Sequence, residues 1–233
     1  NSELQGLTPS GTGSGTEIDH IHIHNSSDDG IEVFGGRTNF KHLVFTGIDD
    51  DAFDSDVGWK GNVQYVIAVH RDGGTIGDSM MEIDSNGNED AVPRQNGAIS
   101  NFTFIHRHNA GPNGVALLIR GGADHTFMNG LIVAPGYRCI GINSATTIAA
   151  ANPALDKVGP PRFHSVSMQC NSQPFSGTSG VTDAQVQAIF EGGTNNRFNY
   201  VPSLTNLFIN GPTETGFTPF NAKTLNAFFD TTS

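Results

Sequence analysis

Short apolar segments recur along the chain with one internal order of apolar and polar positions. The first two copies are residues 18–24 and 40–46, and all their matched positions are 22 residues apart. A segment that recurs at a fixed period is the signature of a solenoid, in which each repeat packs mainly on its neighbours. The chain is therefore predicted to be built from stacked coils.

The later copies keep the pattern with less regular spacing. They are residues 63–68, 99–104, 127–132, 163–168 and 204–209. In all seven copies the first, fourth and sixth places are apolar or small, which predicts a short strand with one face inward. A repeat of 22 residues is too short for a strand plus a crossover helix, which needs roughly 30 residues. The pattern predicts an all-β, right-handed parallel β-helix with coils about 4.8 Å apart.

The same pattern predicts the domain organisation. Residues 1–233 form a single β-helix domain, which we expect to be a fragment of a longer solenoid. Within it, residues 1–15 are an incomplete first coil, 16–147 are regular coils, and 148–233 are irregular coils with a C-terminal cap. A capping box at Thr182 predicts a short helix over about 182–191. The long gaps at 72–98, 107–126 and 144–162 are interpreted as insertions on turns.

The composition of the chain indicates which partners it is not expected to bind and in which compartment it should be found. With 29 Gly, 16 Phe and 15% charged residues, the chain is rich in turns and β-forming residues. A net charge of −11 argues against nucleic acid and anionic membranes as partners. Because no run of 18 apolar residues occurs, no membrane span is expected. Few lysines and much Asn, Thr, Ser and Gly favour an exported protein; Cys139 and Cys170 lie one coil apart, and a disulfide between them is left open.

Acidic residues follow the first two apolar segments at the same offset, so carboxylates of successive coils should stack. The predicted calcium ligands are Asp28, Asp29, Glu32, Asp50, Asp51, Asp54, Glu82 and Asp84. Two carboxylates about 4.8 Å apart repel by roughly 3–4 kcal/mol at an effective dielectric constant near 20. A bound cation, a shared proton or outward splay would relieve this repulsion, and Ca²⁺ suits because it accepts six to eight oxygens in flexible geometry. In the alternative interpretation these acids cap turns and accept hydrogen bonds from backbone amides.

The histidines of the first two segments and the single tryptophan are candidates for binding a metal ion and a sugar. His20, His22 and His24 alternate with isoleucines, so all three should point outward. His42 should lie beside His20, which would suit a transition-metal site, although no carboxylate or thiol is placed by spacing to complete it. An ordinary polar strand face is the favoured interpretation. Trp59 either stacks on a sugar or shields a turn.

Three acidic segments carry a resemblance to a known family. They are Asp-Asp-Gly-Ile-Glu-Val-Phe-Gly-Gly at 28–36, Asp-Asp-Asp-Ala-Phe-Asp at 49–54 and Glu-Ile-Asp-Ser-Asn at 82–86. In these the chain resembles a bacterial family of secreted or lipid-anchored parallel β-helix proteins with the pectate-lyase-like superfamily fold. The resemblance implies an extracellular or bacterial cell-envelope location and no established reaction.

Two classes of function fit these observations. The favoured one is a non-catalytic surface protein, stabilised by Ca²⁺, with a structural, adhesive or filament-forming role. Its partner would be another copy of itself or a surface polysaccharide.

The alternative is a polysaccharide-active enzyme, either a pectate-lyase-like lyase or a polygalacturonase-like hydrolase. The chain resembles the hydrolases in Asp29 together with Asp50 and Asp51, with His70 as the possible catalytic histidine. It departs from them because His70-Arg71-Asp72 stands where Gly-His-Gly is expected, and because the Arg-x-Lys that holds the substrate carboxylate is missing.

Overall fold

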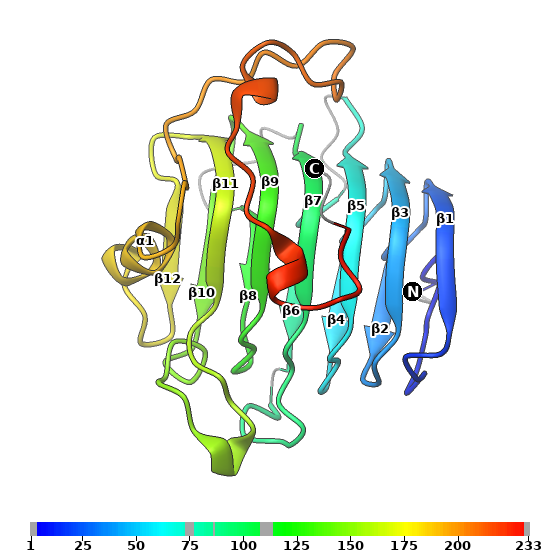
Figure 1. Cartoon of the computed structure of the whole chain (residues 1–233), viewed down its shortest axis with the longest axis vertical. Helices are drawn as coiled ribbons and strands as arrows, with labels where there is room; N and C mark the ends of the chain where they lie inside the picture. The colour runs from blue at the N-terminus through cyan, green and yellow to red at the C-terminus, as the bar shows by residue number, and fades with distance from the viewer. Residues whose placement is uncertain (1–3, 73–76, 86, 108–113, 231–233) are drawn as a thin grey trace.

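The computed structural model describes residues 4–72, 77–85, 87–107 and 114–230. Two six-stranded parallel sheets lie face to face, and the chain visits them alternately (Figure 1). The first sheet is formed by β1 (Glu17–His24), β3 (Asn39–Thr46), β5 (Asn62–Val69), β7 (Ala98–Ile105), β9 (Thr126–Ala134) and β11 (Arg162–Cys170). The second is formed by β2 (Ile31–Phe34), β4 (Phe53–Asp56), β6 (Met81–Asp84), β8 (Val115–Ile119), β10 (Arg138–Asn143) and β12 (Phe175–Thr178).

The strand register follows the repeat. Ile18 pairs with Phe40 and Ile21 with Leu43, so the 22-residue offset of the first two coils is confirmed. The later copies at 63–68, 99–104, 127–132 and 163–168 lie in β5, β7, β9 and β11. The prediction of an all-β fold made of stacked parallel strands is therefore confirmed.

One residue in each strand of the first sheet has a left-handed backbone. The residues are His20, His42, Tyr65, Asn101, Asn129 and Ser165, with φ between 53° and 65°. These are the third places of the repeat, and we call them the left-handed column. A residue with positive φ interrupts the alternation of sides, which is why the inward positions are the first, fourth and sixth rather than every second residue. Phe40, Leu43 and Phe45 illustrate this in β3, where all three are buried.

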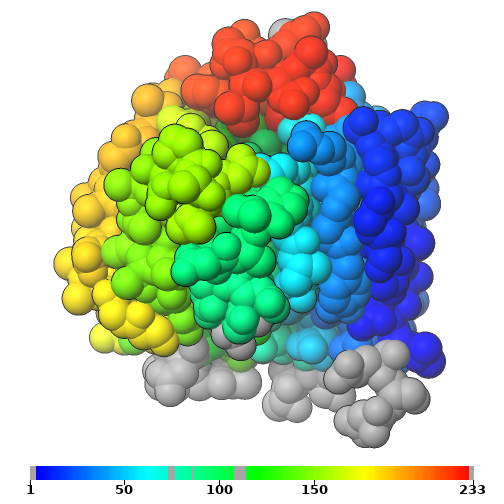
Figure 2. Space-filling model, turned by 90° about the horizontal axis from the view of Figure 1, so that it is seen from below, coloured from blue at the N-terminus to red at the C-terminus, as the bar shows by residue number. Residues whose placement is uncertain are grey.

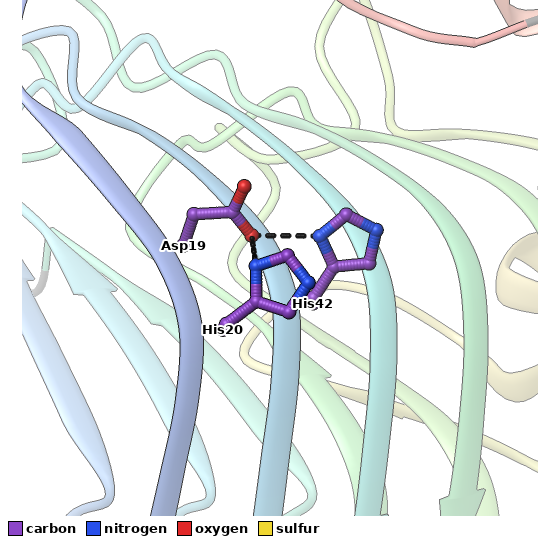
Figure 3. Close-up of side chains that lie close together, drawn as sticks. All are labelled: Asp19, His20 and His42. Carbon is purple, nitrogen blue, oxygen red and sulfur yellow. Dashed lines mark hydrogen bonds and ion pairs between the residues drawn. The ribbon is translucent and has the colours of Figure 1, made fainter.

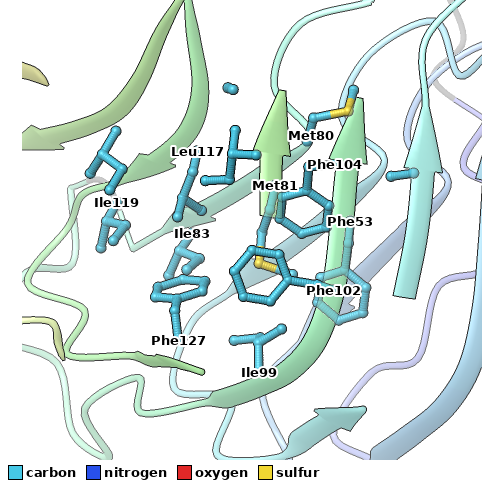
Figure 4. Close-up of a cluster of buried hydrophobic side chains, with 14 of the residues drawn as sticks. Phe53, Met80, Met81, Ile83, Ile99, Phe102, Phe104, Leu117, Ile119 and Phe127 are labelled. Atoms are coloured by element: carbon cyan, nitrogen blue, oxygen red, sulfur yellow. The ribbon is translucent and has the colours of Figure 1, made fainter. Parts of the chain in front are cut away.

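The core fills the space between the sheets with large apolar side chains (Figure 4). Phe53, Met81 and Ile83 point inward from the second sheet, and Phe102 and Phe127 face them from the first. The inward positions of successive coils stack on one another, as do the rings of Phe127 and Phe163, whose centroids are 5.4 Å apart. This stacking makes the core a continuous rod through the coils.

Two expectations need correction, and the alternative left open for Trp59 is decided. The seventh copy, residues 204–209, forms no strand of the first sheet; Thr205 and Ile209 close a tight turn in which Asn206 and Leu207 both have positive φ. The gaps at 72–98 and 107–126 contain β6 and β8, so they are not insertions alone. Trp59 is fully buried and its Nε1 donates a hydrogen bond to the carbonyl oxygen of Thr38, which rules out stacking on a sugar.

The C-terminal part confirms the expected helix and shows how the chain ends. Helix α1 (Asp183–Glu191) begins at the capping box of Thr182 and Gln185 and lies beside β12. Three short 3-10 helices, Pro153–Leu155, Glu214–Gly216 and Ala222–Thr224, lie in the irregular segments. Beyond α1 the chain turns back across the outer face of the first sheet (Figure 1). Figure 2 shows the coils as successive bands of colour with this C-terminal segment, in red, over one side.

Cys139 and Cys170 form a disulfide with a Cα–Cα distance of 5.6 Å, which decides the question that the sequence left open. It joins β10 of the second sheet to the end of β11 in the first. None of the helices in the described part of the chain is long and apolar enough to cross a membrane.

Candidate functional site

The acidic residues of β2, β4 and β6 form a ladder on the outer face of the second sheet. Glu32 pairs with Asp54, and Asp54 pairs with Glu82, so the predicted order of these three side chains is found. On the next strand Glu82 pairs with Leu118, where the carboxylates of this row end. A parallel row two residues later contains Asp56 and Asp84.

A second set of acids lies on the turns that lead into β2 and β4. Asp29 accepts a hydrogen bond from the backbone N–H of Asp51 at 3.0 Å. Asp51 in turn accepts one from the N–H of Ser79 at 2.7 Å. Both side chains are buried, with only 6% and 3% of their surface exposed. The interpretation that acids cap turns therefore holds for these two residues, each through its Oδ1 atom.

Two groups of three carboxylates meet around Asp29. In the first, one oxygen each from Asp29, Glu32 and Asp54 lies within 4.8 Å of the others. In the second, Asp29 is joined by Asp28 and Asp50 within the same distance. The structure thus brings the carboxylates of five of the eight predicted ligands together; Asp51 contacts Asp29 through its backbone N–H, and its Oδ1 atom accepts from Ser79 instead.

The remaining two predicted ligands, Glu82 and Asp84, are neutralised by a cation of the protein. Arg120 forms ion pairs with Glu82 and with Asp84, the latter at 3.0 Å. Sequence reasoning did not assign Arg120 to the ladder. The signal was its place two residues after Leu118, because alternation along a strand puts both on the same face as Glu82 and Asp84.

The centre of the ladder has little compensation for its charge. Gln5 donates hydrogen bonds from its side-chain amide to Asp28 at 3.1 Å and to Glu32 at 2.6 Å. Asp54 Oδ1 is buried, and no hydrogen-bond donor reaches it from the described residues. Within the same part of the chain, no Lys or Arg forms an ion pair with Asp29, Asp51 or Asp54.

Burial and crowding raise the pKa values of these acids. Burial raises the pKa of Asp29 to about 8, and nearby Asp50 and Glu32 add to the effect. Burial likewise raises the pKa of Asp54 to about 9, with contributions from Asp29 and Glu82. The pKa of Asp51 is raised by burial and by Glu82. The buried carboxyls of the ladder therefore hold protons at a higher pH than free carboxyls do.

His70, named for the hydrolase alternative, lies away from solvent. Its side chain is only 2% exposed, and its ring lies 4.3 Å from the ring of His106. A hydrogen bond joins Nε2 of His106 to the carbonyl oxygen of Asp78 at 2.9 Å. The structure thus places His70 inside the molecule, in an aromatic pair, and its catalytic role stays a prediction.

Comparison with models of known protein families gives a match over most of the chain. The model of a pectate-lyase-like β-helix domain matches residues 1–202. No curated protein and no solved structure gives a significant match. The matched region contains every strand of both sheets and all of the acidic ladder. From this match and the two parallel sheets, the chain belongs to the family of pectate-lyase-like β-helix domains.

Proposed function

We propose that this domain is a non-catalytic β-helix of the cell exterior whose coils are locked together by Ca²⁺ in the acidic ladder. The observation that carries the proposal is the group formed by Asp29, Glu32 and Asp54, which come from two successive coils. Their three oxygens lie within 4.8 Å of one another. Ca²⁺ binds oxygens at about 2.3–2.6 Å, so two ligands of one ion are separated by at most roughly 4.6–5.2 Å. The measured spacing is compatible with one shared ion.

The lack of a hydrogen-bond donor at Asp54 Oδ1 favours a bound cation over a role of Asp54 in capping a turn. Asp29 and Asp51 each have a backbone donor for Oδ1, whereas the buried Oδ1 of Asp54 has none among the described residues. A buried acceptor without a partner destabilises the folded state, by about 1–3 kcal/mol or more for a charged group. A calcium ion would satisfy this oxygen and remove the repulsion between coils. The domain would then be stiffest where the N-terminal coils meet.

The proposed biological role is based on the stacked coils and on the acidic ladder. A rod of stacked coils with its charge neutralised by Ca²⁺ suits a structural, adhesive or filament-forming protein that binds a second copy of itself or a surface polysaccharide. The Cys139–Cys170 disulfide supports an oxidising compartment, such as the bacterial envelope or the extracellular space. We also propose that the coil winds in the right-handed sense, as about 98% of parallel crossover connections do.

Calcium should raise the thermal stability of the domain. With Ca²⁺ at 100 times its dissociation constant, binding to the native state contributes about 2.7 kcal/mol, so the Tm should rise by about 5–10 °C relative to EDTA. Asp54→Asn should abolish most of this shift, because it keeps the shape of the side chain and removes its charge. Asp72→Asn, which alters an exposed acid paired with Arg107, serves as the matched control. Equal Tm values in Ca²⁺ and EDTA for the unmodified chain at pH 8 would refute the proposal.

The hydrolase alternative would use Asp29 and Asp50, which lie close together with Asp29 buried and Asp50 exposed. An inverting hydrolase, however, needs carboxyl groups roughly 6.5–9.5 Å apart to leave room for water. Oxygens of these two residues lie within 4.8 Å of each other, which suits a shared cation better.

We expect no reducing ends and no unsaturated product when the calcium-loaded protein is incubated with polygalacturonate, pectin or alginate. Asp50→Asn identifies any contaminating activity, since a contaminant would be unaffected by the substitution. Product formation that disappears in Asp50→Asn would establish the enzyme and overturn the non-catalytic proposal.

A further inference from the structure

A second cluster of ligand atoms lies on the opposite side of the molecule, on the outer face of the first sheet. Asp19 and His20 lie in β1, and His42 lies in β3 (Figure 3). The Oδ1 atom of Asp19 is 2.9 Å from Nδ1 of His20 and 2.7 Å from Nδ1 of His42. We propose that these three side chains form a site for a divalent first-row transition-metal ion, with Zn²⁺ as the simplest occupant.

The left-handed column explains how neighbouring residues come to share one site. In a regular strand, Asp19 and His20 would point to opposite faces of the sheet. The positive φ of His20, 56°, breaks this alternation and puts both side chains on the outer face. His42 has the same backbone conformation, with φ of 53°, one coil further on. The sequence pattern predicts that the two imidazoles lie side by side, but it places no carboxylate beside them, because regular alternation would put Asp19 on the other face.

The spacing of the ligand atoms fits one small ion. With metal–ligand distances of about 2.1 Å, neighbouring ligands of a tetrahedral Zn²⁺ are roughly 3.4 Å apart. The two nitrogen–oxygen distances of 2.9 and 2.7 Å are shorter than this by less than about 1 Å, so the ligands must separate slightly to admit the ion. Both imidazoles now direct Nδ1 at the same oxygen, so metal binding would require only their Nε2–H tautomers and a small outward movement. The other coordination positions would be filled by water, because 75% of the His20 side chain is exposed.

Ring stacking holds the imidazoles in this arrangement. The rings of His20 and His42 stack with centroids 4.2 Å apart and an interplanar angle of 24°. The ring of Tyr65 stacks on the other side of His42 at 5.0 Å and 10°. Ordered rings lose less conformational entropy on binding an ion than free surface histidines do. The three rings also border a surface cavity of about 480 Å³ whose floor includes Leu43 and Val66.

Later members of the left-handed column have another task. Asn129 exchanges two hydrogen bonds with the backbone of Phe220. Ser165 donates to the carbonyl oxygen of Thr218, and Tyr65 donates to Asp230. These contacts attach the C-terminal segment to the sheet. Histidine occupies the column in the first two coils, and Asp19 lies at the position where the next coil has Lys41.

The site differs in chemistry from the acidic ladder, so the two can be tested separately. Imidazole nitrogen favours Zn²⁺, Ni²⁺ and Cu²⁺, whereas carboxylates alone favour Ca²⁺ and Mg²⁺. A chain without an affinity tag, kept in excess Ca²⁺, should bind one Zn²⁺ at this site when followed by titration calorimetry. Failure of the calcium proposal would leave this result unchanged.

Replacing a ligand should weaken binding strongly. His20→Asn or His42→Asn should each lower the affinity for Zn²⁺ by roughly 100-fold, and Asp19→Asn by about tenfold. Asparagine is the right replacement because it already occupies the left-handed column at Asn101 and Asn129. His24→Asn is the matched control, since His24 is an exposed histidine of the same strand that hydrogen-bonds Thr46. It should retain the affinity within about twofold.

Electron paramagnetic resonance of bound Cu²⁺ identifies the ligands directly, and its spectrum does not depend on the overall stability of the fold. The unmodified chain should show coupling to two imidazole nitrogens, and His42→Asn should show one. Circular dichroism melts verify that each variant is folded. Absence of binding at a one-to-one ratio, or equal loss of affinity in His24→Asn and His42→Asn, would overturn the assignment.

Discussion

In calcium-free buffer the domain is expected to lose about 4 kcal/mol or more of its unfolding free energy between pH 5 and pH 8. Asp29 and Asp54 have pKa values of about 8 and about 9 in the folded chain, against 3.8 ordinarily. Between pH 4 and pH 8 the native state therefore binds more protons than the unfolded state, and stability must fall as the pH rises. Three pH units at about 1.4 kcal/mol each give the expected loss for one such carboxyl.

Urea unfolding at pH 5, 6.5 and 8 in EDTA measures this slope. Asp54→Asn should flatten it, since the amide does not titrate and also relieves the repulsion on Asp29. Excess Ca²⁺ should flatten it too, because the ion takes the place of the protons. Asp72→Asn, at an exposed ion pair, should leave the slope as it is. An unfolding free energy that stays level or rises from pH 5 to pH 8 in EDTA would show that the carboxyls of the ladder do not have raised pKa values.

Loss of the disulfide is expected to lower the unfolding free energy by about 3–4 kcal/mol. Cys139 and Cys170 are 31 residues apart, and their bond restricts the unfolded chain over this whole loop. For a chain of this size the Tm should fall by about 7–14 °C. Cys139→Ala combined with Cys170→Ser removes the bond, with alanine chosen for the buried position.

Reduction of the unmodified chain provides the matched comparison. Dithiothreitol should lower its Tm to about the value of the double variant and should leave the double variant unchanged. If the reduced and oxidised chains melt at the same temperature, the bond contributes nothing to stability.

The sequence was sufficient for the coil register and for most of the acidic ladder. Ile18 on Phe40 and Glu32 on Asp54 follow from the 22-residue spacing of the first two coils, because two paired parallel strands keep one offset along their length. The second sheet was harder to locate, since β6 and β8 lie in long gaps of irregular length. The ion pairs of Arg120 were missed for the same reason.

Backbone conformation is what the pattern did not reveal. A polar residue at the third place is compatible with either an ordinary outward position or a left-handed one, and only the second brings Asp19 to His20 and His42. The failure of the seventh copy has a similar origin. Residues 204–209 match the apolar pattern, yet Asn206 and Leu207 both adopt positive φ, and the chain turns back on itself. The spacing of apolar residues predicts which side chains point inward. It does not predict two consecutive left-handed residues.

The 22-residue offset between the first two coils defines a unit that could be repeated. Residues 25–46 span one complete repeat and contain both the acids of one rung and the histidine of the next. Duplicating this unit in tandem would add a rung to each sheet without disturbing the pairing of the others. Under the two metal-site proposals, each such copy would add the acids of one rung but no carboxylate beside its histidine, because Lys41 occupies the position of Asp19. Gene duplication would then raise the capacity for Ca²⁺ alone.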